Sequence, residues 1–204
     1  TFQLSLRRAS DAQMVDTDLN QPVLATGNGT SSTGTFAARA ATSATIAAGT
    51  VSTVKANNSP SSNVSLGATN VKWATFELRA AGEDVKVDSL DLTADTSLGG
   101  LGLDNGKIFL NGVQVGSTKD ITEFGAATTT YTFGSSFILK AGTTAVVDVY
   151  ADAKTTTAVN LANADTVKIY LALGASNGQG QVSLTSINVP TSEVTGNTIT
   201  VSSS

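Results

Sequence analysis

The chain has 204 residues, of which 14% are charged and 5% aromatic, and it contains neither cysteine nor histidine. Without these two residue types it lacks a Ser-His-Asp triad, a thiol nucleophile, an imidazole base and the usual zinc sites, so we expect that it is not an enzyme. Its net charge is −4, and its basic residues stand singly apart from Arg7-Arg8, which argues against nucleic acid as a partner because a phosphate backbone requires several converging cations.

The charge content also bears on location. It lies well below the roughly 25% of charged residues that folded proteins usually carry. This difference favours a subunit that packs against copies of itself or is held outside the cell, with Thr, Ser, Asn and Gly covering much of its surface. No apolar run reaches the roughly 18 residues of a membrane span, and no signal peptide stands at residue 1. We therefore expect no membrane span in this chain and, if the protein is exported, interpret it as the mature form.

The sequence opens with an alternating segment, "TFQLSLRRAS". Phe2, Leu4 and Leu6 fall on one side of an extended chain, which predicts a half-buried strand over residues 2–8. Such a strand can pair with its own sandwich or with the sheet of a neighbouring copy, and both alternatives stay open here. Residues 20–34 combine Pro, three Gly and five hydroxyl residues, a composition typical of a flexible linker. We therefore predict an N-terminal arm over residues 1–35, with a candidate donor strand at 2–8 and a linker at 20–34.

Residues 36–204 are predicted to form one antiparallel β-sandwich, which makes the fold all-β. The clearest signal is "KIFLNGVQVGS", residues 107–117, where two alternating segments flank Asn111-Gly112, the preferred dipeptide of a type I′ hairpin turn. Further strand patterns, among them "QVSLTSINV" at residues 181–189, recur about every ten residues, as in sandwiches. The Ala-rich stretch over 35–50 is interpreted as mostly strand, and a change of phase between Val87 and Leu90 predicts a bulge. The predicted core includes Phe76, Leu78, Val87, Leu110, Val113, Phe133, Val147, Ile169, Leu171 and Ile199.

Candidate sites for small ligands are few. The glycine-rich loop over residues 97–106 has Asn105 where a dinucleotide fingerprint requires Gly, so we interpret it as a flexible or close-packed loop between strands. Carboxylate-only glycoside hydrolysis would need aromatic platforms, and one Trp and three Tyr make poor ones. Trp73 is interpreted as a sandwich-face or subunit-contact residue.

Calcium is the one cofactor that we weigh. It requires six to eight oxygen ligands, and the sequence contains no EF-hand loop. Only Asp95, Asp104 and Asp120 would converge from loops, so they are the candidate ligands, with ordinary solvated carboxylates as the alternative. Asn28, Asn57 and Asn63 begin Asn-x-Ser/Thr sequons in predicted loops and are candidate glycosylation sites if the protein is exported in an organism that glycosylates.

Four segments carry a resemblance to a known family. They are, in chain order, "SPSSNVSLGATNVKWATFELRAAGEDVKVDSLDL", "LDNGKIFLNGVQVGST", "FILKAGTTAVVDVYADA" and "VTGNTITV". Together they resemble an Ig-like β-sandwich repeat of bacterial surface-layer and other cell-surface proteins, found especially in candidate-phylum bacteria. The resemblance runs from Ser59 to Val201 and implies an extracellular, non-enzymatic module that often occurs in tandem. It assigns no catalytic residues and does not extend to the opening strand.

These observations lead to two functional hypotheses. In the first, the chain is a structural subunit of an extracellular, pilus-like filament or a surface layer, and its partners are copies of itself. Phe2, Leu4 and Leu6 would then form the subunit interface by adding a strand to a neighbour's sheet. In the second, the chain is a carbohydrate- or protein-binding adhesin module of a larger cell-surface protein.

Overall fold

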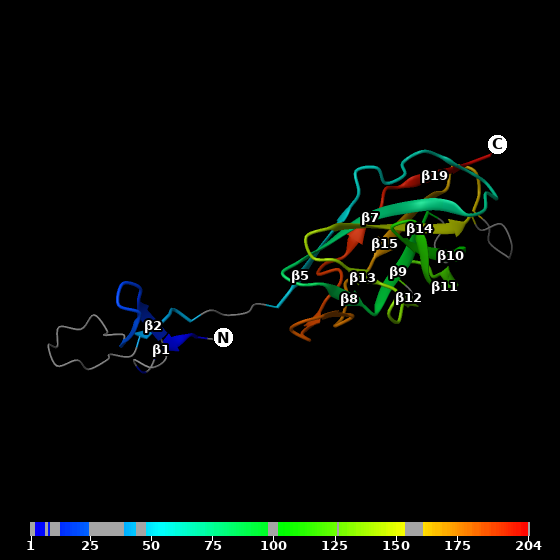
Figure 1. Ribbon diagram of the computed structural model, residues 1–204. Coiled ribbons are helices and arrows are strands. Elements are labelled where there is room, and N and C mark those ends of the chain that lie inside the picture. The colour runs from blue at the N-terminus through cyan, green and yellow to red at the C-terminus, as the bar shows by residue number, and fades with distance from the viewer. Residues whose placement is uncertain are drawn as a thin grey trace. The chain divides into compact units, whose positions relative to one another are not determined.

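A computed structural model describes residues 3–6, 8, 13–24, 39–43, 48–97, 102–125, 127–153 and 161–203. The chain forms two compact units, Thr1–Ala47 and Ala48–Ser204 (Figure 1). The division thus falls after residue 47, whereas the sequence predicts a boundary after residue 35. These two parts of the chain are called the first unit and the second unit.

In the first unit, the residues that the structure describes form two short antiparallel strand pairs. β1 (Ser5–Leu6) pairs with β4 (Arg39–Ala40), and β2 (Gln13–Asp16) pairs with β3 (Gln21–Leu24). β3 occupies the start of the segment predicted as a linker, and residues 25–34 of that segment lie outside the described residues. The Ala-rich stretch supplies β4, although much of it also lies outside the described residues.

The described residues of the second unit form three sheets. A five-stranded sheet has the order β11 (Val113–Ile121), β10 (Leu103–Leu110), β14 (Thr144–Asp152), β7 (Val71–Ala81) and β5 (Thr50–Lys55). A six-stranded sheet has the order β12 (Thr129–Thr132), β9 (Ser89–Thr96), β15 (Thr166–Leu171), β19 (Ile199–Ser202) and β6 (Val64–Ser65), with β18 (Val194–Thr195) also on β15. A four-stranded sheet has the order β13 (Ile138–Leu139), β8 (Val85–Val87), β16 (Gly178–Gly180) and β17 (Ser186–Ile187). The described residues contain no helix, so the prediction of an all-β, sandwich-type fold is confirmed.

Alternation along the long strands builds the core. In β7, Phe76, Leu78 and Ala80 are fully buried, whereas Glu77 and Arg79 between them reach solvent. β14 lies beside β7 and places Val147 opposite Phe76 (Figure 1). Nearly all sheet pairs are antiparallel, as expected, and β19 with β6 is a parallel exception.

The predicted core is largely confirmed. Leu110 is partly buried, and Val113 is 68% exposed, so its assignment to the core was wrong. Val113 directly follows the hairpin turn on the edge strand β11, and Val115 two residues later supplies the core contact. The remaining predicted core residues are buried: Phe76, Leu78, Val87, Phe133, Val147, Ile169, Leu171 and Ile199.

The hairpin prediction is also confirmed. Leu110 pairs with Val113, and both turn residues have positive φ, 49° at Asn111 and 83° at Gly112, as a type I′ turn requires. The Asn111 side-chain oxygen also accepts a hydrogen bond from the Val146 amide (2.8 Å), which attaches the turn to β14.

The alternation of apolar residues changes phase between Val87 and Leu90, but the cause is not the bulge that the sequence predicted. β8 ends at Val87 in the four-stranded sheet, and β9 begins at Ser89 in the six-stranded sheet. Asp88 between them accepts a hydrogen bond from the Phe133 amide (3.0 Å) and donates its own amide to the Asn177 carbonyl (2.7 Å). The chain therefore crosses from one sheet to another at this residue.

Candidate functional site

The opening strand pairs inside its own unit. In addition to the β1–β4 pairing, the Ala41 amide donates to the Leu4 carbonyl (2.8 Å), and the Gln3 side chain donates to the Ala41 carbonyl (2.7 Å). The observed strand is shorter than the predicted 2–8 segment, and Phe2 lies outside the described residues. Among the described residues its partner is thus β4, not a strand of the sandwich.

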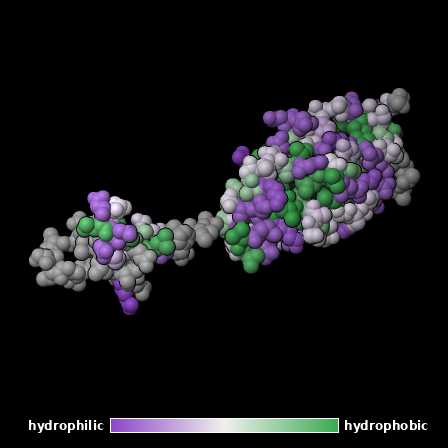
Figure 2. Space-filling model, in the orientation of Figure 1, coloured by the Kyte–Doolittle hydropathy of each residue, from purple (hydrophilic) through white to green (hydrophobic). Residues whose placement is uncertain are grey.

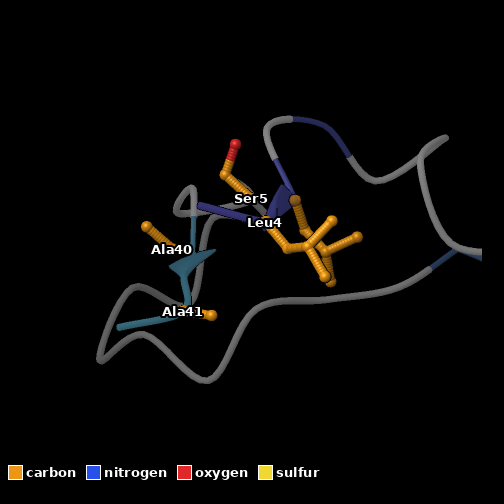
Figure 3. A pocket seen from close by; sticks show the side chains of 5 residues that line it. Leu4, Ser5, Ala40 and Ala41 are labelled. Carbon is orange, nitrogen blue, oxygen red and sulfur yellow. The ribbon is translucent and has the colours of Figure 1, made fainter. Parts of the chain in front are cut away.

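An apolar hollow lies on this strand pair. It has a volume of about 510 Å³ and is lined by Leu4, Ser5, Leu6, Ala40 and Ala41. Figure 3 shows the Leu4 side chain extending away from the Ser5 hydroxyl, as alternation along a strand requires. Leu4 is 76% exposed and Leu6 42% exposed, so two of the three apolar side chains predicted for an interface present their surface to solvent.

A second exposed apolar feature lies in the second unit, where sequence alternation had predicted a strand over residues 181–189. Residues 181–183 form a turn, and only Ser186–Ile187 are strand β17. Val182 and Leu184 in this connection are 77% and 67% exposed. Residues 181–185, here called the hairpin tip, join β16 to β17. Figure 2 shows apolar residues at the surface of both units.

Glu83 holds the hairpin tip in place. Its carboxylate accepts hydrogen bonds from the amides of Val182 (2.7 Å) and Ser183 (2.8 Å) and from the Ser183 hydroxyl (2.6 Å). It also accepts the amide of Gly49 (2.9 Å), directly before β5. These hydrogen bonds, first from the Ser183 hydroxyl and then from the three amides, lower the pKa of Glu83 from 4.5 to about 2. The carboxylate is therefore a charged anchor that joins segments far apart in the sequence.

Two glycines make room for Glu83. A Cβ on Gly49 would lie 2.7 Å from the Glu83 Cγ, and a Cβ on Gly180 would lie 2.4 Å from its Oε1. Both distances are far below ordinary van der Waals contact. Glycine at these two positions is thus explained by the close approach of one carboxylate side chain.

The glycine-rich loop follows the close-packed interpretation where it is described. Residues 98–101 lie outside the described residues. A Cβ on Gly102 would lie 1.9 Å from the Ile121 carbonyl oxygen, and a Cβ on Gly106 would lie 2.3 Å from the Tyr131 hydroxyl. These glycines therefore allow β10 to approach its neighbours, a packing role that needs no bound phosphate.

The calcium candidates do not gather at one place. Asp95 lies on β9 in the six-stranded sheet, where its carboxylate accepts the Tyr170 hydroxyl (3.3 Å). Asp104 and Asp120 lie in the five-stranded sheet, and Asp120 accepts the amide of Asn105 (2.9 Å). Among the described residues, no group of three His, Cys, Asp or Glu side chains is arranged to hold a metal ion.

The sequons differ in their surroundings. Asn28 lies outside the described residues. Asn57 and Asn63 are both exposed, but the hydroxyl of Ser59, which completes the first of these sequons, is buried and accepts the Thr75 amide (3.0 Å). Ser65, which completes the second, is exposed. Only the Asn63 sequon thus combines an exposed Asn with an exposed hydroxyl residue in the described part of the chain.

Aromatic side chains separate into core and surface. Trp73 is buried and donates its indole N–H to the Ala151 carbonyl (3.1 Å), as expected for a residue on the inner face of the sandwich. Phe124, 45% exposed, stacks on Tyr170 with ring centroids 4.4 Å apart. The Lys168 ammonium lies over the same Tyr170 ring, 5.4 Å from its centroid. Sequence reasoning missed this pair, because residues 46 apart in the chain come together only through the sheet.

No family model matches the chain, and no curated protein sequence matches it. Among the described residues, no helix has the length and apolar composition needed to span a membrane.

Proposed function

We propose that the chain is a structural subunit of an extracellular, pilus-like filament or surface layer that assembles by β-strand addition between copies. The observation that carries this proposal is the exposed apolar segment at β1, where Leu4, just before the strand, and Leu6 face solvent beside an apolar hollow. The hydroxyl-rich, weakly charged composition and the resemblance to cell-surface sandwich repeats support an extracellular location.

The β1–β4 pair has only two strands among the described residues, which is a physical reason to expect that it accepts a further strand. A two-stranded pair is marginal in water, and at least three strands with a buried apolar face are needed for independent stability. Within the described residues β1 pairs only with β4, so its other edge offers backbone donors and acceptors. A strand from another copy would satisfy these groups and cover the leucines, which is the usual basis of β-strand addition.

The two units are different structures, and this difference determines the type of assembly that a contact between them would form. A contact between the first unit of one copy and the second unit of the next is heterologous. Heterologous contacts generate an open filament when their rotation does not close into a ring. This is the geometry of a polymer that grows at its ends.

One observation favours the alternative of a carbohydrate-binding adhesin module. The exposed Phe124 ring stacks on Tyr170, and Asp95 and Lys168 place charged groups at the Tyr170 hydroxyl. Aromatic rings with neighbouring hydrogen-bonding groups are the chemistry that binds sugars. A Phe124→Ala variant would lose this stacking surface while leaving β1 unchanged.

Negative-stain microscopy and light scattering of the full chain over a range of concentrations test the two proposals. A filament subunit should form fibres or sheets of regular width as concentration rises. An adhesin module should remain monomeric at all concentrations and bind an immobilised glycan in a way that Phe124→Ala abolishes. Monomeric behaviour throughout would refute the assembly proposal.

A further inference from the structure

The hairpin tip is an unusual surface for a solvent-exposed connection. Val182 and Leu184 expose most of their surface, although Val and Leu are among the residues most often buried. Leu184 also has a φ of 57°, a left-handed conformation that is costly for a bulky side chain. Such backbone conformations persist where the surroundings impose them, and they concentrate at functional sites.

Hydrogen bonds hold the backbone of the tip on both sides of Leu184. The Glu83 carboxylate takes the amides of Val182 and Ser183 together, so the turn is held from inside the second unit. The Gly180 amide donates to the Thr185 carbonyl (3.0 Å), and the Leu184 amide donates to the Gly180 carbonyl (3.1 Å), which closes the tip. The tip therefore presents two apolar side chains on a fixed backbone, which reduces the entropy lost on binding.

Charge indicates which partner fits. The second unit carries nine Lys and Arg against thirteen Asp and Glu, which gives it the whole net charge of −4, whereas the first unit carries three of each sign. All three basic residues of the first unit, Arg7, Arg8 and Arg39, stand in or next to the strands β1 and β4. The strands that line the hollow are thus the basic part of the first unit, complementary in sign to the second unit of another copy.

The tip itself carries no charged side chain, although the Glu83 carboxylate accepts two of its amides. Residues 169–192 contain no Asp, Glu, Lys or Arg, so burying the tip in an apolar site breaks no ion pair within this segment. Near the tip, Asp84 is already paired with Lys140 (2.7 Å). Two second units would repel each other through their like net charges, which disfavours contacts of tip with tip.

We propose that the hairpin tip of one copy occupies the apolar hollow of the first unit of a neighbouring copy. Val182 and Leu184 would then pack against Leu4 and Leu6. The inference rests on the proposed function and names the two surfaces that meet. β17, next to the tip, is the edge strand of its sheet among the described residues, so its backbone is available to a strand of the neighbour.

Cysteine cross-linking tests the contact directly, because the chain has no cysteine of its own. Leu6→Cys and Val182→Cys are made as separate full-length variants, mixed under conditions in which the wild type assembles, and mildly oxidised. A disulfide requires Cα atoms within roughly 7 Å, so a mixed dimer should form in preference to either homodimer. Val113→Cys, at an exposed hairpin elsewhere, is the matched control and should give no preferred product with Leu6→Cys.

A mixing experiment tests the direction of assembly. The tip variant combines Val182→Ser with Leu184→Asn, and Asn is used at position 184 because it tolerates positive φ. If both apolar side chains are buried in the contact, this variant should weaken association roughly 30- to 1,000-fold. Leu4→Asp with Leu6→Asp removes the hollow instead. Each variant alone should stay monomeric, and the mixture should stop at one-to-one dimers, because each partner retains one intact surface.

The outcomes separate the two proposals. If the wild type does not assemble, the proposed function fails and this inference fails with it. If the wild type forms fibres but the cross-link appears only between identical variants, or the tip variant assembles like the wild type, this inference is overturned while the assembly proposal stands. A preferred link between Leu6→Cys and Val113→Cys would place the contact at the other hairpin and would also overturn it.

Discussion

Introducing two charges into β1 should stop assembly without unfolding the second unit. In the double variant Leu4→Asp with Leu6→Asp, two exposed apolar side chains become carboxylates on the strand that lines the hollow. Neither residue belongs to the buried core cluster, which lies entirely in the second unit among the described residues. The main thermal transition of the monomer should therefore stay where it is in the wild type.

The size of the effect follows from the exposed fractions. Full burial of a leucine side chain contributes about 1.5–3 kcal/mol. Leu4 is 76% exposed and Leu6 42% exposed, so covering what remains contributes about 1–2.3 and about 0.6–1.3 kcal/mol respectively. Together these correspond to roughly 20- to 400-fold in the association constant, and burying an unpaired carboxylate adds to the loss.

Sedimentation velocity and negative-stain microscopy measure this loss. The matched control is Val15→Asp with Leu19→Asp, which adds the same charges to exposed apolar positions of the β2–β3 hairpin in the same unit. The control should assemble like the wild type. Assembly by the β1 variant would refute the interface, and loss of its main thermal transition would show instead that β1 supports the fold of the second unit.

Three further predictions concern the second unit. Phe76→Ala should lower the free energy of unfolding by about 3–5 kcal/mol in urea titrations because the ring is fully buried, and a loss below about 1 kcal/mol would contradict that packing. Because hydrogen bonds lower the pKa of Glu83 from 4.5 to about 2, the stability that the ionised carboxylate contributes should be complete above about pH 5 and lost as pH falls towards 2. Glu83→Gln should flatten the profile of unfolding free energy against pH in this range. An unchanged profile between about pH 5 and 2 would contradict the role of the carboxylate. Chelation with EDTA should leave the Tm unchanged, whereas a drop of many degrees would reveal a calcium site that involves Asp95, Asp104 or Asp120.

The parts of the fold that could be predicted depend on local signals. Asn111-Gly112 fixes its hairpin because both residues favour positive φ, and the strands on either side alternate within a few residues. Val113 was misassigned because alternation shows which residues share a face but not that the strand lies at an edge. The phase change at Asp88 was visible in the sequence, whereas the transfer between two sheets depends on hydrogen bonds to Phe133 and Asn177, 45 and 89 positions away.

The candidate site was only partly within reach of sequence reasoning. Leu4 and Leu6 were singled out by their alternation, but the partner strand β4 lies in a stretch whose Ala content favours helix as well as strand. Val182 and Leu184 also alternate with polar residues, which predicted a strand and concealed an exposed turn. Glu83 gave no signal, because the hydrogen bonds that define its role join it to residues 99 and 100 positions later.

The unequal distribution of charge would make the proposed self-association directional. Contacts between two second units bring together surfaces of net charge −4, and contacts between two first units join the arginine-bearing strands β1 and β4 of each copy. Only the unlike pairing of a first unit with a second unit brings a basic strand pair to an acidic body. Because apolar burial is not screened by salt, the hollow and the tip would supply affinity at any ionic strength in the proposed contact, and the charges would supply the choice of partner at low ionic strength. A chain with one surface of each kind would thus grow head to tail, which is the arrangement that an open filament requires.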